Sequence, residues 1–440
     1  MNSMTNRIIL AALLFDAINV SSLQAATFSD ANWSSPGGAG GPVYAVAVDD
    51  SGNFYIGGNF TNVGIVAATN IAKWDGSTWS PLGSGVDGTV TALAVSGTNV
   101  YAGGGFGTAG GGSAANIAKW DGNGWSPLGL GISGYVYALA VSGTNLYVGG
   151  DFNKAGGNSA SDIAKWDGSS WSALGNGVSG GQVFGLAASG SDVYACGAFV
   201  SASTACCTSQ VNGIARWDGS AWWAMPIGAN AGMNNWVTSV AVSGGYVYAG
   251  GFFNYAGGNQ INGIAKWDGS TWSALGSGLY GQVFAIAVSG TNLYAGGGFS
   301  GPGGFPPINI GKWNGSSWSS LSSGVDGTIY GLALWGTNLY AGGTFSNAGG
   351  KPSPNVARAV LGDAPGFSQI AGKSLPNGDV QLSYIGCPAT NYALDRALNL
   401  SAPIGWVGQQ TNTIGISGVL MFTNTPIPGT NNFWRVRSVP

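Results

Sequence analysis

One segment, Asn70 to Gly83 with the sequence N-I-A-K-W-D-G-S-T-W-S-P-L-G, recurs in close copies through most of the chain. A second tryptophan follows the first one five residues later in each copy, and successive copies are 46 to 51 residues apart. The first tryptophans are Trp74, Trp120, Trp166, Trp217, Trp267 and Trp313. Self-similarity at roughly 40–50 residues is typical of β-propeller blades, which bury their apolar faces only against neighbouring blades.

Each repeat divides into four short apolar runs separated by Gly, Asn and Ser. The first follows the pattern V-x-A-L-A-V, as in Val90 to Val95, and the second ends in a Gly-Gly pair. The third and fourth, I-A-K-W and W-S-x-L-G, flank an Asp-Gly turn that places Trp74 opposite Trp79. Short runs bounded by turn residues, without a helical period, predict four antiparallel strands per repeat.

Counting these strands predicts how the structure closes. The first three kinds occur seven times, and the last copy of the third carries Ala359 where the others carry tryptophan. The fourth kind occurs only six times after the first full repeat begins, but Trp33-Ser34 lies upstream as an isolated copy. We therefore predict an all-β, seven-bladed β-propeller of four-stranded blades over residues 27–363. In it, the N-terminal strand of Trp33 completes the blade of Ala359 and removes a free sheet edge.

The residues of the repeat carry a family resemblance. A Gly-Gly pair that ends the second strand, followed by an aromatic-Asp step and another tryptophan, resembles the kelch repeat. The I-A-K-W-D-G-x-x-W-S-x-L-G form is similar to propeller repeats of exported bacterial proteins and of the fungal cortical cell-polarity markers. This resemblance implies the propeller fold but no particular activity, because such propellers host many functions.

The period stops at about Ala364, and residues 364–440 form a second region. About five strands are expected there, at Val380–Ile385, Tyr392–Arg396, Trp406 onward, Val419–Thr423 and Phe433–Arg437. They predict a small β-sandwich-like domain. Its Y-x-L…W…F-T-N…F-W-R pattern resembles C-terminal modules of exported bacterial proteins.

The composition restricts the chemistry. The chain contains no His and no Glu, and only 7% of its residues are charged, with a net charge of −3. His-based nucleophile systems, His-ligated metals and imidazole acid–base catalysis are therefore excluded. No basic stripe exists for a phosphate backbone, so we expect no nucleic-acid partner.

The N-terminus predicts export. Arg7, the apolar run Ile8 to Phe15 and the small residues at Ala25 and Ala26 are typical of a signal peptide over residues 1–26. A short membrane anchor is the alternative, but eight apolar residues fall short of the roughly 20 needed to span a bilayer. We expect a secreted or cell-surface protein of bacterial type, monomeric and without a transmembrane segment.

Cysteines in an exported chain can form disulfides. Cys206 and Cys207 follow Cys196 by ten and eleven residues, so Cys196 is a candidate to bridge either one. Free buried thiols are the alternative interpretation.

Two short motifs have structural and functional interpretations. Asp49, Asp50, Ser51 and Asn53 offer oxygen ligands that suit Ca²⁺, but an ordinary Asx turn is favoured and no cofactor is expected. The repeated Lys-Trp-Asp step, as in Lys73 and Asp75, predicts local ion pairs beside the hairpin turn.

The candidate site lies where the repeat is interrupted. In a four-stranded meander the loops after strands two and four emerge on one face, and the longest insertions fall in these loops of blades four to six. Aromatic, amide and charged residues in or beside them are binding candidates: Trp223, Asn234, Asn235, Trp236, Phe253, Tyr255, Asp151 and Lys154. Longer loops without a function are the alternative.

We expect a non-enzymatic protein that binds an extracellular glycan or protein through this face. A polysaccharide hydrolase or lyase that uses Asp or Tyr, and a structural cell-surface protein, are the rival hypotheses.

Overall fold

The computed structural model describes residues 28–203, 208–225, 232–300 and 309–361, together with six strands between residues 369 and 439. Apart from a 3-10 turn, η2 (Asp30–Asn32), their regular structure is all β. The described residues form two compact units, Phe28–Leu361 and the C-terminal strands, and contain no helix that could cross a membrane. The predicted signal peptide lies outside the described residues.

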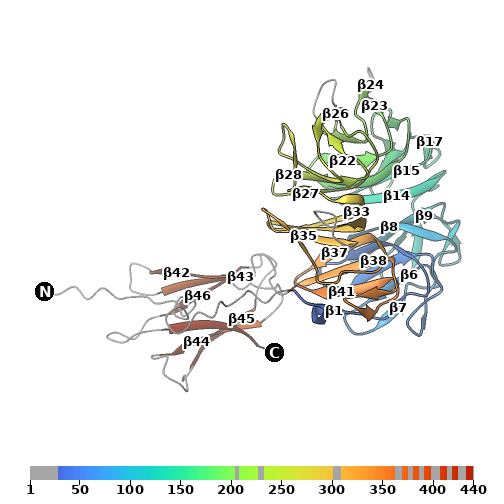
Figure 1. Ribbon diagram of the computed structural model, residues 1–440. Helices are drawn as coiled ribbons and strands as arrows, with labels where there is room; N and C mark the ends of the chain where they lie inside the picture. Colours follow the sequence, from blue (N-terminus) through green and yellow to red (C-terminus); the bar gives the residue numbers. More distant parts are fainter. Residues whose placement is uncertain are drawn as a thin grey trace. The chain divides into compact units, whose positions relative to one another are not determined.

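The first unit is a seven-bladed β-propeller (Figure 1). Each blade is a four-stranded antiparallel sheet, whose strands we call inner, second, third and outer from the channel outward. In that order, blades one to three consist of β2 (Val43–Val48), β3 (Phe54–Gly58), β6 (Ile71–Trp74) and β7 (Trp79–Pro81); β8 (Thr89–Ser96), β9 (Asn99–Gly105), β12 (Ile117–Trp120) and β13 (Trp125–Pro127); and β14 (Tyr135–Ser142), β15 (Asn145–Asp151), β18 (Ile163–Trp166) and β19 (Trp171–Ala173). Blades four to six consist of β21 (Val183–Ser189), β22 (Asp192–Gly197), β25 (Ile214–Trp217) and β26 (Trp222–Ala224); β27 (Val237–Ser243), β28 (Tyr246–Gly251), β31 (Ile264–Trp267) and β32 (Trp272–Ala274); and β33 (Tyr280–Ser289), β34 (Asn292–Ser300), β35 (Ile310–Trp313) and β36 (Trp318–Ser320). Blade seven consists of β37 (Thr328–Trp335), β38 (Asn338–Thr344), β41 (Val356–Val360) and β1 (Trp33–Ser34).

The N-terminal strand closes the ring as the sequence predicts. Strand β1 lies beside β41 (Figure 1) and pairs with it antiparallel, and the register places Trp33 opposite Ala359. Lys351 Nζ donates to the Trp33 carbonyl at 2.8 Å, and Asn32 Nδ2 donates to the Val360 carbonyl at 2.8 Å. The first and last strands of the propeller unit are therefore joined in the sheet of blade seven, so that β41 does not present an unpaired edge.

The outer-strand tryptophans link each blade to the preceding one. Each indole N–H donates to the backbone carbonyl that follows the preceding blade's outer-strand tryptophan by three residues. The bonds run from Trp79 to Pro36, Trp125 to Leu82, Trp171 to Leu128, Trp222 to Leu174, Trp272 to Met225, Trp318 to Leu275 and Trp33 to Leu321, at 2.7–3.1 Å. The series passes through Trp33 and returns to its start, so the tryptophan repeat is a structural belt.

A second series of inter-blade links comes from the residue before the third strand. In blade one Asn70 has a positive φ of 62°, its Oδ1 accepts from Phe60 N–H, and its Nδ2 donates to the Val86 carbonyl of the next connection. The same amide-to-carbonyl bond occurs from Asn116 to Ile132, Asn309 to Val325 and Asn355 to Ala39. Asn tolerates the left-handed conformation and supplies both an acceptor and a donor.

Blade three has a carboxyl at this position. Asp162 adopts the same positive φ, 60°, and its Oδ1 accepts from Phe152 N–H at 2.9 Å. An ionised carboxylate has no N–H to donate toward the connection to the next blade. Burial of the carboxyl, and to a lesser extent the negative charge of Asp151, raise the pKa of Asp162 to about 6. The corresponding residue is Asn in blades one, two, six and seven and Gly in blades four and five, so Asp162 is the titratable residue at this position of the seven blades.

The predicted Lys–Asp ion pairs beside the hairpin turns are not formed. Asp75 instead accepts from the backbone N–H groups of Ser77 and Thr78 at 2.8 and 2.7 Å. These turn hydrogen bonds hold the pKa of Asp75 well below its usual range. Among the described residues, the ion pair within 4.0 Å is Arg216–Asp192, at 3.0 Å. The carboxylates cap their own turns because local N–H donors need less side-chain ordering than a lysine does.

The second unit contains two three-stranded antiparallel sheets, in the region where the sequence predicts a β-sandwich-like domain. One consists of β42 (Gln369–Ser374), β43 (Val380–Ile385) and β46 (Val419–Asn424), and the other of β45 (Val407–Thr413), β44 (Asn391–Ala397) and β47 (Phe433–Val439). The sequence predicts about five of these strands and misses β42, whose Gly and Lys residues weaken the alternating pattern.

Candidate functional site

The loops after the second and outer strands meet on one face of the propeller, which we call the loop face. The connection that enters a blade forms a β-bridge with the loop after that blade's second strand, as between Val86 and Ala109 and between Met233 and Ala256. These second-strand loops mostly form two-residue hairpins: β4 (Asn62–Val63) with β5 (Val66–Ala67), β10 (Thr108–Ala109) with β11 (Gly112–Ser113), β16 (Lys154–Ala155) with β17 (Asn158–Ser159), β29 (Tyr255–Ala256) with β30 (Asn259–Gln260), and β39 (Asn347–Ala348) with β40 (Lys351–Pro352). In blade four the longer loop contributes β23 (Ser201–Ser203) and β24 (Thr208–Gln210), which form a sheet with β20 (Val178–Ser179).

Exposed aromatic rings gather on the loop face of blades three to six. Tyr135 and Trp236 precede the inner-strand valines of blades three and five, and their side chains are 57% and 55% exposed. Phe252, Tyr255 and Tyr280 lie on neighbouring loops or strand ends and are about half exposed. Large aromatic surfaces left in water at one place are typical of a binding site.

The structure separates the predicted site residues into two groups. Trp236 and Asn235 line a cavity of 220 Å³ between the loops of blades four and five, whose other walls include Val200 and Met233. Tyr255 lies on the adjoining hairpin, where it is exposed. Asp151 and Lys154 are exposed at the corresponding positions of blade three, and Gln182 Nε2 donates to Asp151 Oδ2 at 3.3 Å.

The other three predicted residues make structural contacts. Phe253 is 3% exposed and belongs to the core between blades four and five, so it presents no surface to a partner. Asn234 also lines the cavity beside Asn235 and Trp236, and its Oδ1 accepts from the N–H groups of Asn254 and Tyr255, which anchors the hairpin of blade five. Trp223 is exposed, but it lies on outer strand β26 and its indole donates to Asp218, in the turn at the opposite end of the blade.

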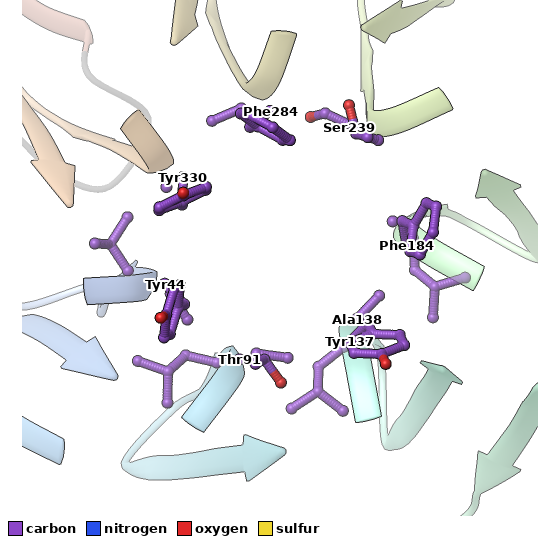
Figure 2. A pocket seen from close by; sticks show the side chains of 18 of the residues that line it. Tyr44, Thr91, Tyr137, Ala138, Phe184, Ser239, Phe284 and Tyr330 are labelled. Carbon is purple, nitrogen blue, oxygen red and sulfur yellow. The ribbon is translucent and has the colours of Figure 1, made fainter. Parts of the chain in front are cut away.

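The central channel contains aromatic residues that the sequence interpretation missed. In every blade the register of the inner strand shifts at the x position of V-x-A-L-A-V, where a β-bulge re-aims the side chain. These bulged residues are Tyr44, Thr91, Tyr137, Phe184, Thr238, Phe284 and Tyr330, and all seven line a cavity of 220 Å³ on the propeller axis. Figure 2 shows the five aromatic side chains around an open centre.

These five aromatics form two arcs around the channel. Tyr330 contacts Tyr44 and Phe284, with ring centroids 5.4 and 5.3 Å apart, and Tyr137 contacts Phe184 at 6.0 Å. Threonines separate the arcs: the hydroxyls of Thr91 and Thr238 donate to carbonyls of the next blade's inner strand, at Val136 and Val283. Because each bulge lies near the start of its inner strand, just after the connection into the blade, the seven bulged residues lie toward the loop face.

The second arc continues onto the exposed rim. Tyr137 stacks on Tyr135 at 6.2 Å, and Phe184 meets Trp236 edge-on at 6.1 Å. Burial, with the charge of Asp151, raises the pKa of Tyr137, so its hydroxyl remains a neutral donor at physiological pH. An uninterrupted aromatic path therefore runs from the channel to the exposed rings of blades three and five.

The calcium and disulfide candidates are surrounded as follows. Asp49 Oδ1 accepts from the N–H groups of Ser51 and Asn53, and its Oδ2 accepts from Tyr55 Oη–H and the Asn53 side chain, as in an Asx turn. Within the described residues no group of three or more His, Cys, Asp or Glu side chains is placed to hold a metal ion.

Cys196 is a free thiol buried in blade four, where burial raises its pKa. Cys206 and Cys207 lie outside the described residues.

Comparisons with known proteins show neither a family nor a function. No protein-family model matches the chain, and no curated protein matches it. Among solved structures, virginiamycin B lyase from Staphylococcus aureus aligns at 12% identity over 73% of this chain and 95% of that one, with a TM-score of 0.42. A catalytically inactive variant of that lyase with quinupristin aligns at 13% identity over 73% and 96%, with a TM-score of 0.45. The computationally designed Ika4 protein aligns at 11% identity over 52% and 94%, with a TM-score of 0.25. At these values the similarity supports no statement about activity.

Proposed function

We propose that this chain is an exported, non-enzymatic protein that binds an extracellular glycan on the loop face of blades three to five. The observation that supports this proposal is the group of exposed rings formed by Tyr135, Trp236 and Tyr255. A sugar ring has an apolar face of C–H groups that packs on an aromatic plane, while its hydroxyl groups need polar partners. Asp151, Gln182 and Asn235 are nearby polar residues of this kind.

Binding on this face is expected to depend on Trp236. Replacing Trp236 by alanine should reduce retention of the protein on a polysaccharide about tenfold, because a lost aromatic contact of about 1.4 kcal/mol changes affinity by that factor. The measurement is sedimentation of the purified protein with insoluble cellulose, chitin, xylan and mannan. Trp335→Ala is the matched control, since Trp335 is 40% exposed but ends inner strand β37, away from the loop face.

Retention on none of the four polysaccharides would contradict the glycan proposal and favour a protein partner on the same exposed rings. Retention that Trp236→Ala and Trp335→Ala leave equally unchanged would place the binding surface elsewhere.

Export is part of the proposal. Cleavage of a signal peptide in Leu23–Ala26 would leave Phe28 and Trp33 in the mature chain, so the ring could still close. Sequencing the N-terminus of protein recovered from the periplasm or medium of a bacterial host tests this. An intact N-terminus would contradict it.

One observation favours a hydrolase as the second candidate. Burial, and to a lesser extent the charge of Asp151, raise the pKa of Asp162 to about 6, and a carboxyl with a raised pKa can serve as the general acid of glycoside hydrolysis. Replacing Asp162 by asparagine distinguishes the two functions. A hydrolase would lose the release of reducing sugar, whereas a binding protein would keep its retention on the polymer.

A further inference from the structure

The central channel has the features of a ligand site in its own right. All seven inner strands carry a bulge at the same position, and five of the bulged residues are aromatic. These aromatic rings remain partly exposed around a cavity of 220 Å³. Partly exposed rings around an open cavity are better suited to hold a group from outside than to fill a core.

The lining of the channel defines the class of that group. It consists of Tyr, Phe, Thr, Ser, Gly and aliphatic residues, with no Asp, Lys or Arg among them. An anionic or cationic group would therefore lose hydration without meeting an opposite charge. A neutral ring that is apolar on its face and carries hydroxyl groups at its edge matches a lining that combines aromatic rings with tyrosine hydroxyls.

The volume limits how much of a ligand enters. A cavity of 220 Å³ is smaller than the roughly 300–1,000 Å³ of pockets that enclose a whole drug-sized ligand. It therefore admits one ring-sized group, and the remainder of the ligand must lie outside. The stacks of Tyr137 on Tyr135 and of Phe184 on Trp236 connect the channel to the exposed rim, where that remainder would lie.

We propose that the channel mouth binds the terminal sugar of a neutral glycan chain, while the following sugars lie across Tyr135 and Trp236. This inference rests on the proposed function and adds that the protein recognises chain ends. Binding should then depend on the number of ends in a sample. A polysaccharide that has been partly hydrolysed offers more ends for the same mass.

The chain itself supplies a conservative variant for the test. Thr91 and Thr238 occupy the bulged position in blades two and five, and their hydroxyls bond to the next blade. Phe284→Thr therefore copies a residue that the fold already accepts at this position, and it removes a ring of the arc that does not reach the rim. Chemical denaturation of the variant checks that the propeller remains folded.

The experiment is calorimetric titration of the full chain with cellohexaose, chitohexaose, xylohexaose and mannohexaose. We expect at least one to bind, with affinity reduced about tenfold in both Phe284→Thr and Trp236→Ala and unchanged in Trp335→Ala. In a companion measurement, the protein retained per gram of the matching polymer should rise when partial hydrolysis multiplies its ends.

Three outcomes separate the two proposals. Binding that Trp236→Ala weakens but Phe284→Thr leaves unchanged overturns the channel site and retains the proposed function. Retention that is independent of the number of ends also overturns recognition of chain ends. If no hexaose or polymer binds, both proposals fail.

Discussion

Replacing Trp33 by alanine is expected to lower the free energy of unfolding of the propeller by about 3–5 kcal/mol. The Trp33 side chain is 1% exposed and packs in the core of blade seven, and its indole donates to the Leu321 carbonyl at 3.1 Å. The substitution leaves a cavity and an unpaired buried carbonyl, and it weakens the strand that closes the ring. Denaturant unfolding followed by tryptophan fluorescence measures the change.

Trp223→Ala is the control for this prediction. Trp223 also lies on an outer strand, but it is 44% exposed, and its loss should change stability by less than about 1 kcal/mol. A more severe test is a chain that begins at Val43 and therefore lacks β1. If this chain unfolds at the same denaturant concentration and with the same cooperativity as the natural one, closure by β1 does not stabilise the propeller.

Replacing Asp162 by asparagine is expected to stabilise the propeller above about pH 6, by about 1 kcal/mol, with little effect near pH 4. The folded-state pKa of Asp162 is about 6, against 3.8 for an unperturbed carboxyl. Because the folded state holds this proton more tightly, the contribution of Asp162 to stability is fully present below about pH 4. It is lost as the pH rises through 6. The expected size of this stability difference allows for solvent screening of the half-buried Asp162 carboxyl.

Measuring the free energy of unfolding of the natural protein and of Asp162→Asn at each pH separates the effect of Asp162 from that of the turn aspartates, which both proteins contain. The pKa of Asp75 is lowered, so its contribution is present above about pH 4 and is lost as the pH falls, which is the opposite direction. The reciprocal variant Asn70→Asp should lose about 1–3 kcal/mol at pH 8, since Asn70 is 7% exposed and donates to Val86. A stability difference for Asp162→Asn that is constant from pH 4 to 8 would contradict the assignment.

The count of repeated strands was sufficient to predict the ring. The absent tryptophan at Ala359 and the isolated Trp33 identified the two strands that pair, and the structure confirms this register. Such a prediction succeeds because seven nearly identical blades repeat the same constraint. The turn aspartates were misinterpreted, because the Lys-Trp-Asp spacing shows a possible ion pair but not the competing N–H groups of the turn.

The candidate site was harder to predict, for two reasons. Phe253 is a sequence candidate because it lies in the same class of loop as the insertions, yet it occupies a repeat position where phenylalanine is always buried. The seven members are Phe60, Phe106, Phe152, Phe199, Phe253, Phe299 and Phe345. Alignment of the repeats would have shown this.

The channel aromatics were missed for a different reason. Strict alternation along V-x-A-L-A-V does not reveal the bulge that turns Tyr137 and its counterparts toward the axis. The available signal was an aromatic residue at x in five of seven repeats, in a strand whose other positions are small or aliphatic.

The pairing of β1 with β41 also sets a schedule for synthesis. Ser34 and its partner Arg358 are separated by 324 residues, so the first outer strand emerges from the ribosome long before its neighbours exist. At roughly 5–20 residues per second this interval is on the order of tens of seconds. During that interval blade one, whose Trp79 bonds to Pro36, can hold the N-terminal segment in place. The last blade is therefore assembled from the earliest and the latest parts of the propeller to be made.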